Sequence, residues 1–322
     1  MTLNQHIKQF LEYLEIEKGR SQRTCRNYEF YLKRFADWAK DPSPDKITTP
    51  VIKNYRLWLN RLTDAKNQSL KKNTQNYHLI ALRSFLKYLA KNDVKTLASE
   101  KIELAKTPER TVEFLEGSDL ERLLEAPQRI DNPDIIKKRD KAILELLFST
   151  GLRVSELTSL TKDSLNLQKD EFTIRGKGDK PRIVFLSNQS KFWIRQYLEA
   201  RKDMDPALFV SHDRAKKGRP NEKTANPLTP RSIQRLVKKY SKAAGITKDI
   251  TTHTLRHSYA TDLLINGADI RSVQAMLGHA SITTTQIYTH ITNQQLRDVH
   301  KAFHGRKRKQ QESKGSTGEK KE

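Results

Sequence analysis

Apolar side chains in the first hundred residues recur at helical spacing. In four segments they follow the i, i+3, i+4, i+7 pattern that places one face of a helix in a core. The four stripes are Ile7, Phe10, Leu11 and Leu14; Tyr28, Tyr31, Leu32, Phe35 and Trp38; Tyr55, Trp58, Leu59 and Leu62; and Leu79, Leu82, Phe85, Leu86 and Leu89. Ser21 is a suitable N-cap for the second helix. The pattern predicts a helical bundle over residues 1–100, with the aromatic stripes in its core.

The rest of the chain alternates between helical stripes and one strand-like segment. Residues 101–113 carry alternating charge and few apolar side chains, which predicts a linker. Two short apolar runs between residues 171 and 187 flank Gly176-Lys-Gly-Asp-Lys-Pro181, which predicts an antiparallel β-hairpin. Helical patterns begin near Ser118 and cover residues 135–150, 191–201, 230–244, 253–265, 270–277 and 283–288. We therefore expect a mainly α protein, with a mixed α/β domain over residues 114–304.

The net charge of the chain indicates what kind of partner it binds. The formal net charge is +23. Residues 1–106 hold 21 Lys and Arg against 11 Asp and Glu, and the remainder holds 40 against 27. Both halves are therefore basic, which favours a polyanion such as nucleic acid that touches both. A merely solubilising surface is the alternative. Residues 211–229 predict an exposed loop, and residues 305–322, which contain no apolar side chain, predict a disordered basic tail.

Composition also restricts the class of protein. The single cysteine, Cys25, excludes an internal disulfide and a cysteine-based metal site, and we expect it to be structural. No stretch approaches the roughly 20 apolar residues of a membrane span. The first residues mix charge with helical apolar spacing and do not read as a signal peptide. We expect a cytoplasmic, nucleoid-associated protein without a membrane partner.

Four motifs follow one another in the second half of the chain. They are Thr150-Gly-Leu-Arg-Val-Ser-Glu-Leu157, Gly176-Lys-Gly178, His253-Thr-Leu-Arg-His257 and Leu277-Gly-His279, with Tyr288 nine residues later. In this order the chain strongly resembles the tyrosine recombinase (phage integrase) family, and within it the Xer branch. The segment from Gly278 to His290 is especially Xer-like, and the pattern from Ser21 to Phe35 resembles the family's SAM-like core-binding domain. The resemblance implies an enzyme that cuts and rejoins DNA.

The chemistry of that reaction fits the residue types. A hydroxyl nucleophile needs cations that stabilise the phosphate oxygens and an acid for the leaving 5′ oxygen. Arg153 and Arg256 suit the two non-bridging oxygens, because a guanidinium makes bidentate bonds to phosphate. His253 lies three residues before Arg256, so both share one helix face. A phosphotyrosine conserves the bond energy, so we expect no cofactor, metal or ATP.

The resemblance assigns the remaining roles. It implies that Lys177, at the hairpin tip, is the general acid, although a solvated turn is the alternative. It gives His279 a phosphate contact and a part in proton handling. Glu156 lies one helical turn after Arg153 and is expected to orient an active-site cation, unless it is only a surface carboxylate. Further candidate DNA contacts are Arg23, Lys180 and Arg182.

Tyr288 is the predicted nucleophile among 10 tyrosines. Its spacing from His279 fits the family, and its neighbours are polar, which places it outside an apolar stripe. Tyr259 follows Arg256 too closely and reads as a packing residue. His257 is left out of the catalytic set, because it is expected to face a different direction from Arg256.

The resemblance also implies partners. It points to double-stranded DNA with a specific recombination site, bound by a homotetramer or by a heterotetramer with a paralogue, and to an FtsK-type DNA translocase. In the family a terminal helix such as residues 293–303 docks into the neighbouring protomer, whereas packing on its own domain is the alternative. An integrase of a mobile element, a type IB topoisomerase-like enzyme and a DNA-binding module without activity stay open as alternatives.

Overall fold

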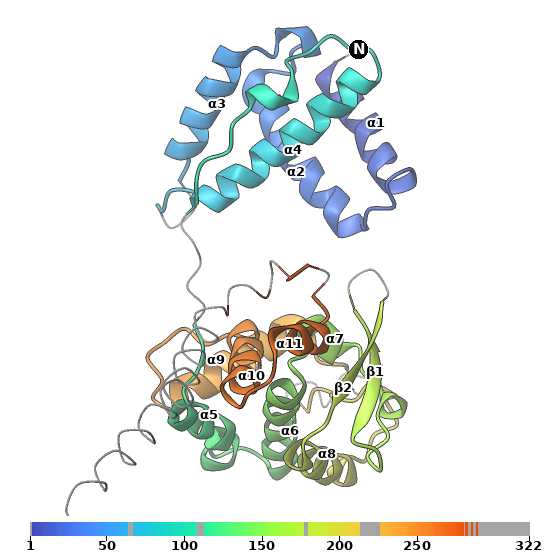
Figure 1. The fold of residues 1–322 in the computed structure, drawn as a ribbon, viewed down its shortest axis with the longest axis vertical. Helices are drawn as coiled ribbons and strands as arrows, with labels where there is room; N and C mark the ends of the chain where they lie inside the picture. Colours follow the sequence, from blue (N-terminus) through green and yellow to red (C-terminus); the bar gives the residue numbers. More distant parts are fainter. Residues whose placement is uncertain are drawn as a thin grey trace, which may run out of the picture. The chain divides into compact units, whose positions relative to one another are not determined.

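The computed structural model describes residues 2–63, 67–107, 113–176, 180–212 and 226–279, together with Ser281, Ile282, Thr285 and Tyr288. The chain divides into two compact units, Met1–Glu109 and Arg110–Glu322, which are considered separately (Figure 1). The predicted linker, residues 101–113, spans this division. Predicted features that lie outside the described residues are Lys177, most of the loop 211–229, the helix 293–303 and the tail 305–322.

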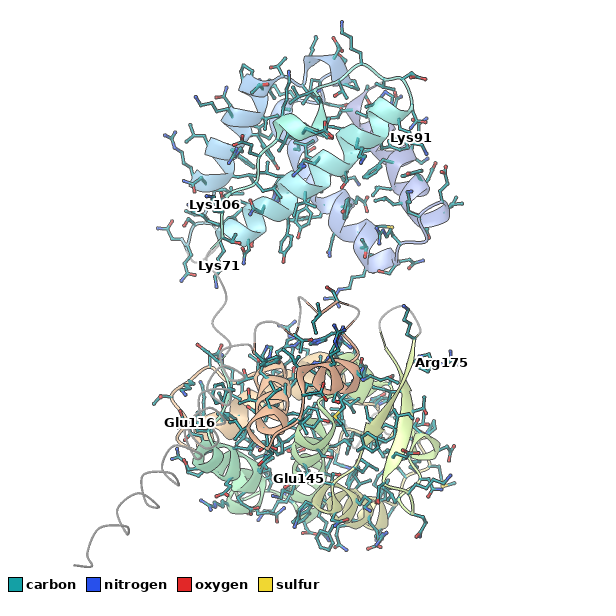
Figure 2. All side chains as sticks on the ribbon, viewed as in Figure 1. Lys71, Lys91, Lys106, Glu116, Glu145 and Arg175 are labelled. Carbon is teal, nitrogen blue, oxygen red and sulfur yellow. The ribbon has the colours of Figure 1, made fainter. Side chains whose placement is uncertain are left out.

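The first unit is a bundle of four helices. They are α1 (Leu3–Ile16), α2 (Gln22–Ala39), α3 (Thr49–Arg61) and α4 (Lys72–Lys91), with one-turn 3₁₀ helices at Pro44–Lys46 and Ser99–Lys101. The predicted cap is present, because Ser21 Oγ accepts a hydrogen bond from the backbone N–H of Thr24 at 3.3 Å. The aromatic stripes do form the core: Phe35, Tyr55 and Phe85 are fully buried. Lys71 and Lys91 mark the two ends of α4 in Figure 2.

The second unit is built around one buried helix. Its helices are α5 (Gly117–Arg129), α6 (Asp134–Thr150), α7 (Val154–Thr158), α8 (Asn188–Ala200), α9 (Pro230–Ala243), α10 (Thr252–Ile265) and α11 (Ile270–Leu277), with a 3₁₀ turn at Lys162–Ser164. Helix α6 packs against α5, α8 and α10. Its buried polar groups are paired, as burial requires: Lys141 Nζ lies 2.6 Å from a carboxylate oxygen of Glu125 and 2.8 Å from one of Glu145. Glu145 is labelled in Figure 2.

The predicted hairpin forms the only sheet among the described residues. Strand β1 (Glu171–Arg175) pairs antiparallel with β2 (Pro181–Phe185), and Ile174 is opposite Arg182. The backbone N–H of Gly176 donates to the carbonyl of Lys180 at 2.9 Å and closes the ladder below the tip. Side chains alternate along the strands, so that Phe172, Ile174 and Val184 enter the core. The prediction of a mainly α fold with one small antiparallel sheet is confirmed.

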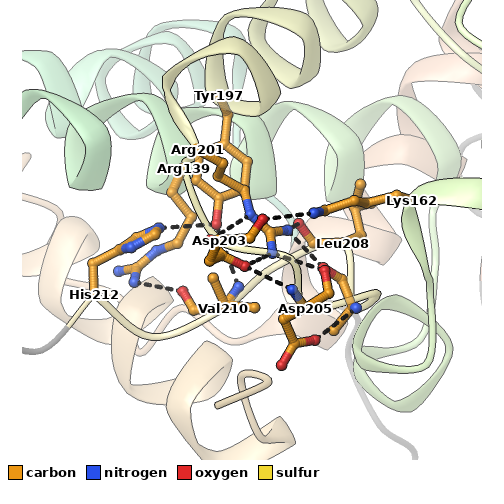
Figure 3. A network of polar contacts seen from close by, with 10 residues as sticks. Arg139, Lys162, Tyr197, Arg201, Asp203, Asp205, Leu208, Val210 and His212 are labelled. Carbon is orange, nitrogen blue, oxygen red and sulfur yellow. Dashed lines mark hydrogen bonds and ion pairs between the residues drawn. The ribbon is translucent and has the colours of Figure 1, made fainter. Parts of the chain in front are cut away.

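A buried polar network holds the segment after α8 against α6 (Figure 3). Arg139 Nε donates to Asp140 at 2.7 Å, and its Nη1 donates to the carbonyl of Val210 at 3.0 Å. The hydroxyl of Tyr197 lies 3.0 Å from Nε2 of His212. Burial, followed by the charge of Arg139, lowers the pKa of His212 to about 4. The imidazole is therefore neutral at pH 7 and adds no positive charge to the network.

Candidate active site

Arg153 lies where α7 begins and is held by its own helix. Its backbone N–H donates to Glu156 Oε2 at 2.8 Å, and its Nη1 donates to Oε1 at 2.8 Å. Glu156 is the third helical residue, a position from which a carboxylate reaches back to the N-cap. The side chain of Arg153 remains 28% exposed, so its guanidinium can still reach a ligand.

Glu156 is a buried carboxylate shared between two arginines. Besides Arg153, it accepts two hydrogen bonds from Arg182, at 2.9 and 3.0 Å. Burial alone would raise the pKa of Glu156, but the bonds from Arg182 and Arg153 outweigh it and lower the pKa below its usual value. The carboxylate is therefore ionised at neutral pH, and it orients Arg153 rather than lying at the surface.

Arg256 is buried and fixed by the ends of two helices. It lies in the second turn of α10. Its Nη1 donates to the carbonyl of Gly151, just after α6, and its Nη2 donates to the carbonyl of Leu277, the last residue of α11, both at 2.5 Å. Carbonyls at helix C-termini lack a partner in their own helix and carry partial negative charge, so a guanidinium suits them. Burial lowers the pKa of Arg256 to about 9, which leaves it protonated at pH 7.

Two predicted histidines come close to these arginines. His253 is exposed on α10, and partial burial of its ring, followed by the charges of Arg256 and Arg153, lowers its pKa. His279 follows the end of α11, and its Nδ1 lies 3.0 Å from the hydroxyl of Thr285. Burial and then the charges of Arg256 and Arg153 lower the pKa of His279 to about 4. Both rings are neutral at pH 7 and can donate or accept one proton each.

Tyr288 has a different setting from the one that the sequence predicted. Its side chain is fully buried and belongs to an apolar cluster with Tyr259, Leu264 and Leu277. The polar sequence neighbours that placed it outside an apolar stripe gave no sign of this burial, because the apolar residues around it belong to α10 and α11. Burial raises the pKa of Tyr288 to about 12, and nearby Arg256 opposes this rise.

His257 is a direct neighbour of Tyr288 that the sequence argument missed. Its Nδ1 lies 2.5 Å from the hydroxyl of Tyr288. Burial, then His253 and Arg256, lower the pKa of His257 to about 4. Since both partners are neutral at pH 7, the phenol can donate its hydrogen to Nδ1. The signal was the spacing of four residues from His253, which places both histidines on one helix face.

The remaining predicted residues have varied positions. Arg23 and Lys180 are exposed, as a DNA contact requires, and their role stays a prediction. Arg182 is different, because its side chain is only 8% exposed and bonded inside the protein. Lys177 lies outside the described residues, although its neighbour Gly176 is placed: a Cβ added there would lie 3.7 Å from Glu156 Oε1.

The arrangement is suited to bind an anion and transfer a proton. The predicted residues that the structure brings together come from α7, α10 and the end of α11, and α11 contacts both α10 and β2 (Figure 1). Arg153 and Arg182 share the carboxylate of Glu156, and Arg256 is bonded to carbonyls, which leaves a net positive charge beside neutral histidines and a tyrosine hydroxyl. In the described part of the chain, no group of three or more His, Cys, Asp or Glu residues could hold a metal ion.

Comparison with known proteins identifies the family of the chain. The profile described as "Phage integrase family" matches residues 113–295, and "Phage integrase, N-terminal SAM-like domain" matches residues 7–93. Tyrosine recombinase XerD of Oceanobacillus iheyensis is 36% identical over 313 residues, which cover 93% of this chain and 98% of the relative. Tyrosine recombinase XerC of Thermodesulfovibrio yellowstonii is 35% identical over 93% of this chain and 96% of the relative.

Solved structures give the same answer. The crystal structure of XerA recombinase is 31% identical, covers 94% of this chain and 99% of its own, and superposes with a TM-score of 0.51. XerH site-specific recombinase bound to a palindromic difH substrate, a post-cleavage complex, is 23% identical over 91% of this chain and 83% of its own, with a TM-score of 0.68, and supports the fold. The chain therefore belongs to the phage integrase family of tyrosine recombinases, enzymes that cleave and rejoin DNA.

Proposed function

We propose that the chain is a Xer-type site-specific recombinase in which Tyr288 attacks the scissile phosphate and forms a 3′-phosphotyrosine. The P–O bond to Tyr288 forms while the bond to the 5′ oxygen breaks, and the proton of the phenol passes to Nδ1 of His257, the hydrogen-bond partner of the hydroxyl. Arg153 and Arg256 bind the non-bridging oxygens, and His253 and His279 add hydrogen bonds to them. Lys177 protonates the leaving oxygen, which is a prediction from its motif.

One observation carries this proposal. Arg153, Arg256 and His279 come from segments more than 20 residues apart, yet they lie close together: Arg256 donates to the carbonyl of Leu277, two residues before His279, and both arginines lower the pKa of His279. The charge of Arg256 also acts to lower the pKa of Tyr288. A cluster of cations beside a tyrosine hydroxyl fits phosphoryl transfer to that hydroxyl. Because Tyr288 is buried and bonded to His257, its attack requires a movement that exchanges His257 for the phosphate.

A nicked suicide substrate tests the nucleophile. Cleavage releases a short fragment from such DNA and traps the covalent adduct, which peptide mapping should place at Tyr288. Tyr288→Phe should abolish the adduct but retain DNA binding, since only the hydroxyl is lost. Tyr259→Phe is the matched control, because Tyr259 lies in the same apolar cluster, and it should still form the adduct. An adduct that survives Tyr288→Phe contradicts the assignment.

The biological role follows from the relatives. We propose that four protomers, either identical or paired with a paralogue, hold two DNA sites and exchange strands through a Holliday junction to resolve chromosome dimers. An FtsK-type translocase would control the reaction at the nucleoid. The identity to XerD and XerC proteins supports this role over a mobile-element integrase. Of the described helices, none is long and apolar enough to cross a membrane.

Selection of binding sites from random DNA tests this role. A Xer-type protein should select one sequence with a single match in the host chromosome, and two such sites on a plasmid should recombine. Relaxation of a supercoiled plasmid that lacks any selected site would instead favour a topoisomerase-like enzyme. Phosphate contacts should make binding strongly salt-dependent in either case.

A further inference from the structure

Arg182 lies on β2, yet its guanidinium joins three separate segments. Its Nη1 and Nη2 donate to the two carboxylate oxygens of Glu156, at 2.9 and 3.0 Å, as a two-pronged fork. Its Nε donates to the carbonyl of Met276 near the end of α11, at 3.1 Å. The bond to Met276 is next to the bond that Arg256 makes to Leu277. Two arginines therefore hold consecutive carbonyls of the same helix end.

Arg182 also lies against the two glycines that border predicted catalytic residues. A Cβ added to Gly278, which precedes His279, would lie 2.8 Å from Cδ of Arg182. A Cβ added to Gly176, which precedes Lys177, would lie 3.6 Å from its Nη1. Gly278 has a φ of +63°, so a side chain there would be both strained and obstructed. The space that a side chain would need is taken by Arg182.

We infer that Arg182 is a positioning residue, which sets the relative placement of Arg153, the β1–β2 hairpin and His279 without touching DNA. It acts on Arg153 through the shared carboxylate of Glu156, on the hairpin through its own strand, and on His279 through the end of α11. A DNA phosphate contact is the competing role for a basic residue beside the site. The buried side chain, 8% exposed, and the three internal bonds argue for positioning. This inference rests on the proposed function.

Arg182→Lys in the full-length protein separates the two roles. Lysine keeps the charge but cannot reproduce the fork and the third bond at once. Positioning predicts that DNA affinity and its salt slope stay unchanged, while single-turnover cleavage of a nicked suicide substrate at saturating DNA falls on the order of 100-fold. A second variant, Glu156→Gln, should lower cleavage similarly. The double variant should be little worse than either single one, because both remove the same link.

Two comparisons control the experiment. Arg195→Lys, the same substitution at an exposed position of α8, should leave cleavage unchanged. Lys180→Ala, at an exposed predicted phosphate contact, should weaken binding and reduce the salt slope by about 1. If Arg182→Lys behaves like Lys180→Ala, or leaves cleavage unchanged, the inference is wrong. If Arg182→Lys lowers the midpoint of thermal unfolding, Glu156→Gln takes its place, and the same results for DNA affinity and cleavage support or contradict the inference. A wild-type protein that forms no adduct would instead refute the proposed function itself.

Discussion

Gly151→Ala is the substitution whose effect the structure defines most sharply. Gly151 ends α6 with a φ of +59°, and its carbonyl accepts the bond from Arg256. An added Cβ would lie 2.5 Å from Cδ1 of Tyr259, 3.0 Å from its Cε1 and 3.3 Å from a methyl carbon of Leu277. Tyr259 is only 8% exposed, so its ring cannot swing into solvent. The substitution must therefore shift either the ring or the backbone that holds Arg256.

The expected loss of stability has two parts. A residue with a side chain in the left-handed conformation is destabilised by about 1–2 kcal/mol relative to glycine. Forcing a methyl group into a packed interior adds about 1–3 kcal/mol. Together they predict that Gly151→Ala lowers the free energy of unfolding by roughly 2–5 kcal/mol. Gly245→Ala is the matched control, because Gly245 has a φ of +69° but no heavy atom within 4 Å of an added Cβ.

Urea unfolding of the full-length variants measures both parts. Gly245→Ala should lose only the backbone part, so the difference between the two variants gives the steric part directly. Cleavage of the suicide substrate should also fall in Gly151→Ala but not in Gly245→Ala, because a backbone shift at residue 151 moves the carbonyl that holds Arg256. Equal unfolding free energies for the two variants would refute the steric argument. Equal cleavage rates would refute the link from Gly151 to Arg256.

Two further predictions concern polar groups that are buried in the second unit. Tyr240→Phe removes the hydrogen bond that the hydroxyl donates to Asp140 at 2.7 Å, and it should lower the free energy of unfolding by about 1–3 kcal/mol, whereas Tyr77→Phe, at an exposed tyrosine, should not change it. Acid should destabilise the fold, because His212, His257 and His279 have folded pKa values of about 4, below their ordinary 6.5. The unfolded chain then binds more protons, so stability is full above about pH 6.5 and falls towards pH 4. A urea midpoint that stays constant between pH 7 and 5 would contradict this cause.

The fold was readable from the sequence where a single local pattern determined the element. The four stripes of the first unit predicted its helices because the aromatic and aliphatic residues of each helix lie on the one face that packs in the core. The hairpin was readable because glycines and Asp179 interrupt two apolar runs. Helix α6 was predicted with its end at Gly151, but its paired polar residues were not, since Lys141 meets Glu125 from another helix.

The site was readable as a set of residue types but not as an arrangement. The motifs of Arg153 and Arg256 made them candidates, yet nothing local shows that Arg256 bonds to carbonyls 105 and 21 residues away. Arg182 was predicted to contact DNA because it is a basic residue in the hairpin that carries Lys177. The sequence does not distinguish an arginine that faces solvent from one that bonds Glu156. His257 was excluded because it faces a different direction from Arg256. Its spacing of four residues from His253, which places both histidines on one helix face, was the informative feature.

The two glycines of the motifs explain why Arg256 can be buried. Gly151 and Gly278 both adopt the left-handed conformation that ends a helix, and each end leaves carbonyls without a partner in their own helix. Arg256 binds one such carbonyl from each end, at Gly151 and Leu277. The negative ends of α6 and α11 thus compensate a guanidinium that is 5% exposed and that, among the described residues, no carboxylate bonds directly. Since neutral carbonyls hold it, Arg256 keeps its full positive charge for a phosphate. Arg153 and Arg182, by contrast, are bonded to the carboxylate of Glu156, which offsets part of their charge.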